Sequence, residues 1–214
     1  MRVLKFGGTS VGSAANLGRM RDVITRELAH RPVVVVSAHS GVTNELLAQA
    51  QSAARGGFTL GEVRRRHDGL YGEIGVDPAL VAPLLEELEV IFRGISALKE
   101  LTPRTRDLVA SYGERMSARG IAAWLTAQGV TSRAIDAWDL GLRTDSRFTQ
   151  ANPDPTCFPQ VRKALRAVKG AVPVVTGFIA KDTHGEITTL GRSGSDFTAT
   201  LLGAAVGADE VQIW

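Results

Sequence analysis

Three glycine-bearing turns carry most of the residues that could do chemistry in this sequence. The first follows a short apolar run and reads Lys5-Phe6-Gly7-Gly8-Thr9-Ser10. Glycines let a backbone approach an anion closely, and N–H groups at a turn or a helix start point toward it. Lys5 ends the expected strand, where a cation can offset the charge of a transferring phosphoryl group. The turn is a candidate phosphate site, and a plain strand–helix turn is the alternative.

This first turn matches neither of two common nucleotide motifs. Gly7 and Gly12 have the glycine interval of a P-loop, but Ser13-Ala14 stand where Lys and Ser or Thr are required. The second glycine is also displaced from its place in a dinucleotide fingerprint. Anion binding here would therefore rest on neither motif.

The second turn reads Gly191-Arg192-Ser193-Gly194-Ser195-Asp196 and lies between an expected hairpin and an expected helix. Its glycines and serines suggest backbone donors aimed at an anion. The guanidinium of Arg192 can clamp a carboxylate with two parallel hydrogen bonds. Asp196 also suits the positive end of a helix dipole, so a well-capped helix is the alternative.

The third turn, Ser37-Ala38-His39-Ser40-Gly41-Val42-Thr43-Asn44, follows the most hydrophobic expected strand and opens a helix. Ligands of open α/β sheets gather beyond the carboxyl ends of strands. His39 is tempting as a base, but a lone histidine in a turn is expected to be incidental. Glu114 is a further candidate, either a surface residue or a partner for a substrate ammonium. Gly113 beside it costs helix stability, which suggests a kink or a close approach.

The elements that would position these turns alternate between strand and helix. The Val33–Val36 run is unbroken and β-branched, as is typical of a central strand covered on both faces. The region 59–128 is almost entirely helical in pattern, with Thr102 as an N-cap and Pro103 at the first helical position, and is expected to cover one side of the sheet. The order predicts an α/β fold with a mainly parallel sheet. Strands are expected at Val3–Phe6, Val33–Val36, Thr131–Ile135, Val172–Thr176 and Glu210–Ile213, a hairpin at Gly177–Ala180 and Glu186–Leu190, and helices at Asn16–His30, Val42–Ala54, Thr59–Ile74, Ala79–Lys99 and Ser195–Val206.

Composition excludes several classes of protein. The 214 residues are 44% hydrophobic and 22% charged, which suits one α/β domain with a real core. The formal net charge is only +3, and the dense run Arg64-Arg65-Arg66 has a helical setting, so no nucleic-acid partner is expected. Cys157 is the single cysteine, which rules out an intramolecular disulfide and a multi-thiolate zinc site. No signal peptide or long apolar run is apparent, so a cytoplasmic protein with no membrane partner is expected.

Taken together, these segments resemble the signatures of aspartate kinases, in the order of that family and over nearly the whole chain. The strongest match is the stretch Thr188–Asp196. The matching segments are Lys5–Val11, Val35–Asn44, Gly113–Ser117, Arg143–Asp145 with Phe148, Thr176–Ile179 and Thr188–Asp196.

The resemblance implies the amino-acid-kinase fold, a three-layer α/β/α sandwich with a mainly parallel sheet. It implies one catalytic domain over residues 1–214, with a helical insert at about 59–128. The implied reaction is the ATP-dependent phosphorylation of the L-aspartate side-chain carboxylate, the first step of lysine, threonine and methionine biosynthesis. Mg²⁺ would accompany ATP, and the full-length protein would be a homo-oligomer.

The resemblance also implies roles for individual residues. Aspartate would be bound through Arg192 at its α-carboxylate and Glu114 at its α-ammonium, and Asp196 would orient Lys5 and the catalytic groups. The residues that would serve the ATP phosphates are Lys5, Gly7 and Gly8, and those that would hold aspartate are Ser37, Thr43, Glu114, Arg192 and Ser195.

Three departures from the family pattern stand out. His39 stands where an apolar residue is more usual, and Ser193 where a glycine is usual, which questions the backbone shape of that loop. The family continues beyond the final strand with further nucleotide-binding loops and usually ACT regulatory domains, whereas this sequence ends at Trp214. The fold is therefore expected to be truncated at its C-terminal side, with an incomplete nucleotide pocket. A glutamate, acetylglutamate or nucleotide kinase and a non-catalytic amino-acid-binding or oligomerisation fragment are the alternatives.

Overall fold

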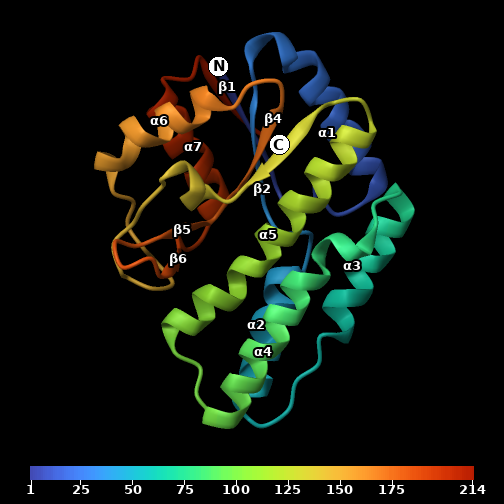
Figure 1. The fold of residues 1–214 in the computed structure, drawn as a ribbon, viewed down its shortest axis with the longest axis vertical. Coiled ribbons are helices and arrows are strands. Elements are labelled where there is room, and N and C mark those ends of the chain that lie inside the picture. Colours follow the sequence, from blue (N-terminus) through green and yellow to red (C-terminus); the bar gives the residue numbers. More distant parts are fainter.

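A five-stranded, wholly parallel sheet runs through the middle of the chain (Figure 1). The computed structural model describes residues 1–214. The strand order is β3-β4-β2-β1-β7, so the two strands with the most apolar sequences lie inside the sheet. The strands are β1 (Arg2–Phe6), β2 (Val33–Val36), β3 (Ser132–Ile135), β4 (Val172–Thr176) and β7 (Glu210–Ile213), and a separate antiparallel hairpin is formed by β5 (Ile179–Lys181) and β6 (Ile187–Thr189).

Alternation along the strands divides the core into two layers of side chains. On one face Leu4 and Val34 pack with helices α1 to α5, and on the other Val3 and Val35 pack with α6 and α7. Figure 1 shows these two helical layers on opposite sides of the strands. The expected three-layer α/β/α sandwich is confirmed. The helices are α1 (Ala14–Glu27), α2 (Val42–Ala53), α3 (Gly61–Ile74), α4 (Ala82–Leu98), α5 (Pro103–Ala127), α6 (Phe158–Ala167) and α7 (Gly194–Val206), with 3-10 turns η1 (Leu28–His30), η2 (Pro78–Val81), η3 (Ala137–Leu140) and η4 (Pro155–Cys157).

Helix α5 connects the helical extension to the sheet. Its N-terminus is capped as expected, because the Thr102 hydroxyl oxygen accepts from the N–H of Thr105 and Pro103 occupies the first turn. The helix continues through Gly113 without a break. A Cβ at Gly113 would lie 2.8 Å from the Cβ of Ala38, so a close approach, and not a kink, explains this glycine.

One helix was missing from the sequence-based expectation, and one short hairpin was found where expected. Helix α6 packs beside α7, with Val161 and Leu165 turned into the core and the buried Cys157 just before it. In the hairpin, the Asp182 carboxylate accepts from the N–H groups of His184 and Glu186, which closes the turn. None of the helices combines the length and the apolar character needed to cross a bilayer.

Gly120 offers a test of how closely α5 packs against α3. A Cβ at this position would lie 2.3 Å from the Tyr71 hydroxyl oxygen, and Tyr71 is fully buried and donates to the carbonyl of Met116. We expect Gly120→Ala to lower the free energy of unfolding by about 1–3 kcal/mol, because the ring has no space to retreat.

Gly94 is the matched control. It lies in the interior of α4 with nothing within 4 Å of an added Cβ. Gly94→Ala should raise the unfolding free energy by up to about 1 kcal/mol through helix propensity alone. Urea titrations of both variants measure the difference, and equal stability of the two would contradict the packing account.

Candidate active site

Six of the residues for which a catalytic or substrate-binding role is expected line one pocket at the carboxyl edge of the sheet. The pocket has a volume of about 270 Å³. It gathers the end of β1, the loop after β2, the middle of α5 and the first turn of α7, which come together because parallel strands end at the same edge. The lining residues are Lys5, Ser37, Thr43, Glu114, Phe178, Gly191, Ser193, Gly194, Ser195 and Asp196.

An ion pair between Lys5 and Asp196 lies at the centre of this arrangement. The Lys5 ammonium nitrogen is 2.6 Å from a carboxylate oxygen of Asp196. The Lys5 side chain is only 11% exposed, whereas that of Asp196 is 41% exposed. Asp196 belongs to the first turn of α7, where the helix dipole favours a negative charge. The pair therefore holds a largely desolvated cation at the mouth of the pocket.

The two glycines after Lys5 act mainly through close approach. A Cβ on Gly7 would lie 3.3 Å from the Lys5 ammonium, and one on Gly8 would lie 3.0 Å from the carbonyl oxygen of Ala38. The N–H of Gly7 donates to the carbonyl of Trp214, so that donor is occupied within the protein. Both glycines flank the pocket and do not line it.

Glu114 is buried, so its alternative as a surface residue is wrong. Its side chain is 4% exposed, and one carboxyl oxygen accepts from the N–H of Ala38 at 3.2 Å. The second carboxyl oxygen is buried and has no hydrogen-bond partner in the protein. Burial raises the pKa of Glu114 to about 8. The group is therefore mostly protonated at pH 7, with one oxygen free for a ligand.

Two residues of the turn before α7 have the left-handed backbone conformation that glycine favours, and one of the two is a serine. Ser193 has φ 55° and Gly191 has φ 75°. The helix itself approaches the β4–β5 connection closely, since a Cβ on Gly177 would lie 2.7 Å from the Ser195 side chain. The doubt about this loop is thus resolved: Ser193 adopts the left-handed conformation, and Ser195 and Asp196 keep their places in the pocket.

Arg192 is the one predicted substrate residue that the structure leaves outside the pocket lining. Its side chain is exposed and forms no ion pair or hydrogen bond with the rest of the chain. The backbone turn carries it at the rim, next to Ser193 of the lining. The expected clamp of Arg192 on a substrate carboxylate therefore stays a prediction, with the side chain placed beside the pocket.

Two residues that sequence analysis missed help to shape the pocket. Phe178 lines it with a positive φ of 67°, and its N–H donates to the hydroxyl of Thr198. Asp107 accepts from the N–H groups of Thr149 and Thr189, and so fixes the end of β6 just before the α7 turn. Asp107 lies near the start of an expected helix, where an acidic residue is common. The sequence therefore gave no indication that it contacts the distant Thr149 and Thr189.

His39 links two of the three turns and is not part of the pocket. It is 6% exposed, and its Nδ1 lies 2.7 Å from the carbonyl oxygen of Val11, so the loop after β2 is tied to the loop after β1. Its ring packs edge-on against those of His67 and Tyr71. Burial lowers the pKa of His39 to about 3, and the neighbouring His67 acts in the same direction. His39 is therefore neutral, and it holds the loop after β2 against the loop after β1.

The pocket offers limited carboxylate chemistry for a metal ion. No three His, Cys, Asp or Glu side chains gather into a metal site. Asp196 and Glu114 are the acids of the lining; the side chain of Asp196 is 41% exposed, whereas Glu114 is buried. Mg²⁺ commonly binds through one or two carboxylates together with substrate phosphates and water. A single carboxylate at Asp196 fits that manner of binding.

Comparisons with known proteins place the whole chain in one family. The model of the Amino acid kinase family matches residues 1–214. The chain is 40% identical to Aspartokinase 1, chloroplastic, of Arabidopsis thaliana over 99% of its length and 39% of that protein. It is 32% identical to Lysine-sensitive aspartokinase 3 of Escherichia coli (strain K12), covering 99% of the chain and 48% of that protein. The crystal structure of E. coli aspartokinase III in complex with aspartate and ADP superposes with a TM-score of 0.82 at 30% identity, over 100% of this chain and 48% of that one. The chain thus spans less than half the length of these relatives.

The buried His39 predicts a defined pH dependence of stability. The folded-state pKa lies below the ordinary value of 6.5, so the folded state binds fewer protons and stability is lost as the pH falls below 6.5. Between pH 7 and pH 5 the histidine should cost about 2 kcal/mol of unfolding free energy, at about 1.36 kcal/mol per pKa unit. His39→Phe should remove this contribution.

Chemical denaturation of the wild type and His39→Phe at several pH values measures the difference. Subtracting one curve from the other cancels the opposing contribution of Glu114, whose pKa is raised. As the pH falls from 7 to 5, the unfolding free energy of the wild type should fall by about 2 kcal/mol more than that of His39→Phe. Parallel curves would show that His39 does not titrate between the folded and unfolded states.

Proposed function

The chain belongs to the amino acid kinase family, and from that premise we propose that its activity is the transfer of a phosphoryl group from ATP to the side-chain carboxylate of L-aspartate. The observation that carries the proposal is the single pocket that combines the Lys5–Asp196 ion pair with the free oxygen of Glu114. One part suits a phosphoryl group and the other suits an ammonium group. The product, 4-phospho-L-aspartate, would enter amino-acid biosynthesis.

The reaction needs positioning and charge stabilisation more than a base. In the step, an oxygen of the aspartate side chain forms a bond to the γ-phosphorus while the bond to the β–γ bridging oxygen breaks and ADP leaves. A carboxylate with an ordinary pKa near ~3.9 is already ionised at pH 7. Two unit charges ~4 Å apart repel by roughly 4 kcal/mol at an effective dielectric of about 20, and the Lys5 ammonium offsets this repulsion.

Recognition of a free amino acid would use groups from several helices and the turns before them. Glu114 from α5 would meet the α-ammonium through its unpartnered oxygen. The hydroxyls of Ser37, Thr43 and Ser195 line the same pocket and can bond to carboxylate oxygens. Arg192 would reach the α-carboxylate only after its exposed side chain turns inward from the rim, which a flexible surface arginine can do.

Nucleotide binding is proposed on a narrower basis. Gly7 and Gly8 allow a close approach of the phosphates beside Lys5. Mg²⁺ would be held by the phosphates together with Asp196, where it would neutralise charge on the transferring group. The matching crystal structure of E. coli aspartokinase III is a complex of that protein with aspartate and ADP. Homo-oligomer formation and a cytoplasmic site are expected of the whole enzyme in the same way.

A hydroxamate trap for acyl phosphates tests the proposal. The trap is run with ATP, Mg²⁺ and one acceptor at a time: L-aspartate, L-glutamate or N-acetyl-L-glutamate. We expect product with aspartate and least with the acetylated acid, because it has no ammonium for Glu114. Product with another acceptor only would reassign the substrate.

The second candidate, an amino-acid-binding module without catalysis, is separated by calorimetry. Such a module takes up aspartate and ignores ATP. It is favoured by the N–H of Gly7, which donates to the carbonyl of Trp214 and is therefore not free for phosphate. Binding of both ligands by the chain would exclude it.

Lys5 provides the sharpest mutational test of the chemistry. In a polypeptide active in the hydroxamate assay, we expect Lys5→Ala to lower kcat by on the order of 10²- to 10³-fold, since a charge that acts on the transferring group is lost. The Kd for aspartate should change by less than about threefold. Lys163→Ala, which removes an exposed cation of α6, is the control and should leave both values unchanged. Unchanged turnover of Lys5→Ala would remove Lys5 from the chemistry.

Glu114 predicts that aspartate binding releases a proton. With its pKa raised to about 8, the carboxyl is mostly protonated at pH 7, and it must ionise to pair with an ammonium. Close to one proton should therefore be released per aspartate bound at pH 7, and the affinity should rise as the pH approaches and passes 8. Calorimetry in buffers with different ionisation enthalpies counts the protons.

Two variants separate this effect from a general loss of binding. Glu114→Gln should weaken aspartate by about 10- to 100-fold and abolish proton release. Ser37→Ala removes a hydroxyl of the same pocket, so it should weaken binding while proton release persists. Aspartate binding by the wild type without any proton release would contradict the assigned role of Glu114.

A further inference from the structure

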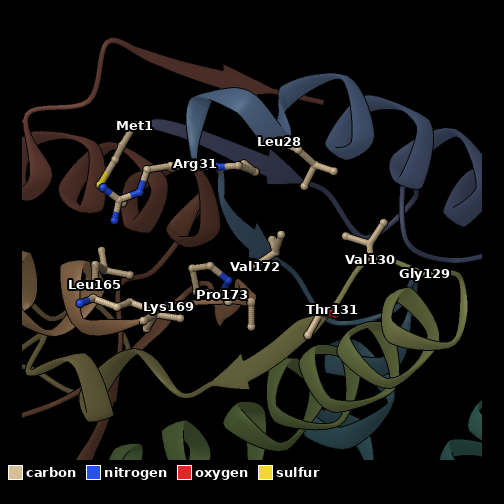
Figure 2. A pocket seen from close by; sticks show the side chains of 14 residues that line it. Met1, Leu28, Arg31, Gly129, Val130, Thr131, Leu165, Lys169, Val172 and Pro173 are labelled. Carbon is tan, nitrogen blue, oxygen red and sulfur yellow. The ribbon is translucent and has the colours of Figure 1, made fainter.

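The amino edge of the sheet carries a second, larger cavity that the proposed chemistry does not use. Its volume is about 570 Å³, compared with about 270 Å³ for the pocket at the carboxyl edge. None of the residues assigned to the kinase reaction lines it. The lining residues are Met1, Leu28, Arg31, Pro32, Gly129, Val130, Thr131, Leu165, Val168, Lys169, Gly170, Ala171, Val172 and Pro173 (Figure 2). We call this cavity the amino-edge groove.

Two prolines keep the groove open. Strands β2 and β4 pair from Val34 and Val174 onward. Pro32 and Pro173 precede this first pair and have no N–H to donate, so the ladder cannot extend toward the amino ends of the two strands. Arg31, with φ 51°, turns the chain sharply just before Pro32. The groove is therefore built into the backbone and does not depend on side-chain conformation alone.

Charge is distributed unevenly along the groove. Arg31 and Lys169 are the only charged side chains of its lining, and no aspartate or glutamate is among the lining residues. Neither cation forms an ion pair within the chain, whereas the amino group of Met1 is paired with Asp209. The groove thus presents positive charge without a balancing acid.

The two cationic groups lie at the same end of the groove. In Figure 2 the charged ends of Arg31 and Lys169 both lie toward Met1 and Leu165. The aliphatic side chains of Leu28 and Val130 lie at the other end. The groove is therefore cationic at one end and apolar at the other.

We propose that the amino-edge groove binds a small aliphatic carboxylate that carries no ammonium group. The guanidinium of Arg31 and the ammonium of Lys169 meet the carboxylate, and the apolar end takes the hydrocarbon chain. An amino acid is disfavoured, because no acidic side chain of the lining can meet its ammonium. The cavity volume falls within the range of small-molecule sites. This proposal does not rest on the kinase activity.

Octanoate is the probe for the first experiment. It is titrated into the 214-residue chain, with binding followed by calorimetry and by the methyl signals of Leu28, Val130 and Leu165 in NMR spectra. We expect one site and shifts of these methyl groups. Octylamine, which has a cation in place of the carboxylate, and norleucine, which adds an ammonium, should bind at least about tenfold more weakly, as expected for loss of one charge-assisted contact.

Exposed-residue variants localise the head group without endangering the fold. Arg31→Asn tolerates the left-handed backbone, and Lys169→Gln removes the other cation. Each should weaken octanoate by about tenfold. Lys163→Gln, an exposed cation of the same helical layer outside the groove, is the control and should have no effect.

Several outcomes would overturn the proposal. These are the absence of octanoate binding, equal binding of octylamine, or equal losses with Lys163→Gln and Lys169→Gln. An acidic peptide that bound through Arg31 and Lys169 while octanoate did not would also overturn it, and would identify the groove as a protein-docking surface. Methyl shifts confined to the carboxyl-edge pocket would place octanoate in the aspartate site instead.

Discussion

The ion pair between Lys5 and Asp196 is the interaction on which the architecture of the candidate active site depends. It joins the end of β1 to the first turn of α7, two elements from opposite ends of the sequence. A nearly buried ammonium needs an anionic partner, because its desolvation is otherwise costly. The partner can reach it only because α7 packs closely on the sheet connections, where Gly177 and Gly194 leave no room for a Cβ. Gly177 and Gly194 therefore allow the close packing that brings Asp196 to Lys5, in addition to any role in the backbone turns.

This pair also sets the charge state of the pocket before any ligand enters. Lys5 and Asp196 neutralise each other, and burial keeps Glu114 mostly protonated near pH 7. The pocket by itself is therefore close to neutral, which suits the loss of bulk water around it. Under the proposed function, an incoming amino acid would bring its own ammonium and carboxylates, and the phosphates would compete with Asp196 for Lys5. In the proposed reaction, ligand charges would thus replace interactions that the protein already makes, at lower desolvation cost than for isolated buried charges.

Local sequence was sufficient for the strands, and the resemblance to aspartate kinases supplied most of the residues that line the pocket. Neither gave the orientation of the side chains. The strand Val33–Val36 was predicted to the residue, because an unbroken run of β-branched residues strongly favours a buried strand. Helix α6 was missed because it is short, and only Val161 and Leu165 of its ten residues are buried. The burial of Glu114 depends on Ala38 fitting against Gly113, a contact between distant segments. For Arg192 the sequence predicted the turn correctly, yet the rotamer that would direct the guanidinium inward is not fixed by any contact.

Cavity volume alone would have assigned the chemistry to the wrong edge of the sheet. At the carboxyl edge, strands run into the N-termini of α1, α2 and α7, so backbone N–H groups and dipoles favour anions there. At the amino edge, α5 and α6 end near Gly129 and Lys169, where carbonyl groups favour cations instead. Any anion at the amino edge must therefore be held by the side chains of Arg31 and Lys169 against the local helix dipoles. Such a site suits a carboxylate, but it lacks the oriented backbone donors that phosphoryl transfer requires, which is why we place the proposed reaction in the smaller pocket.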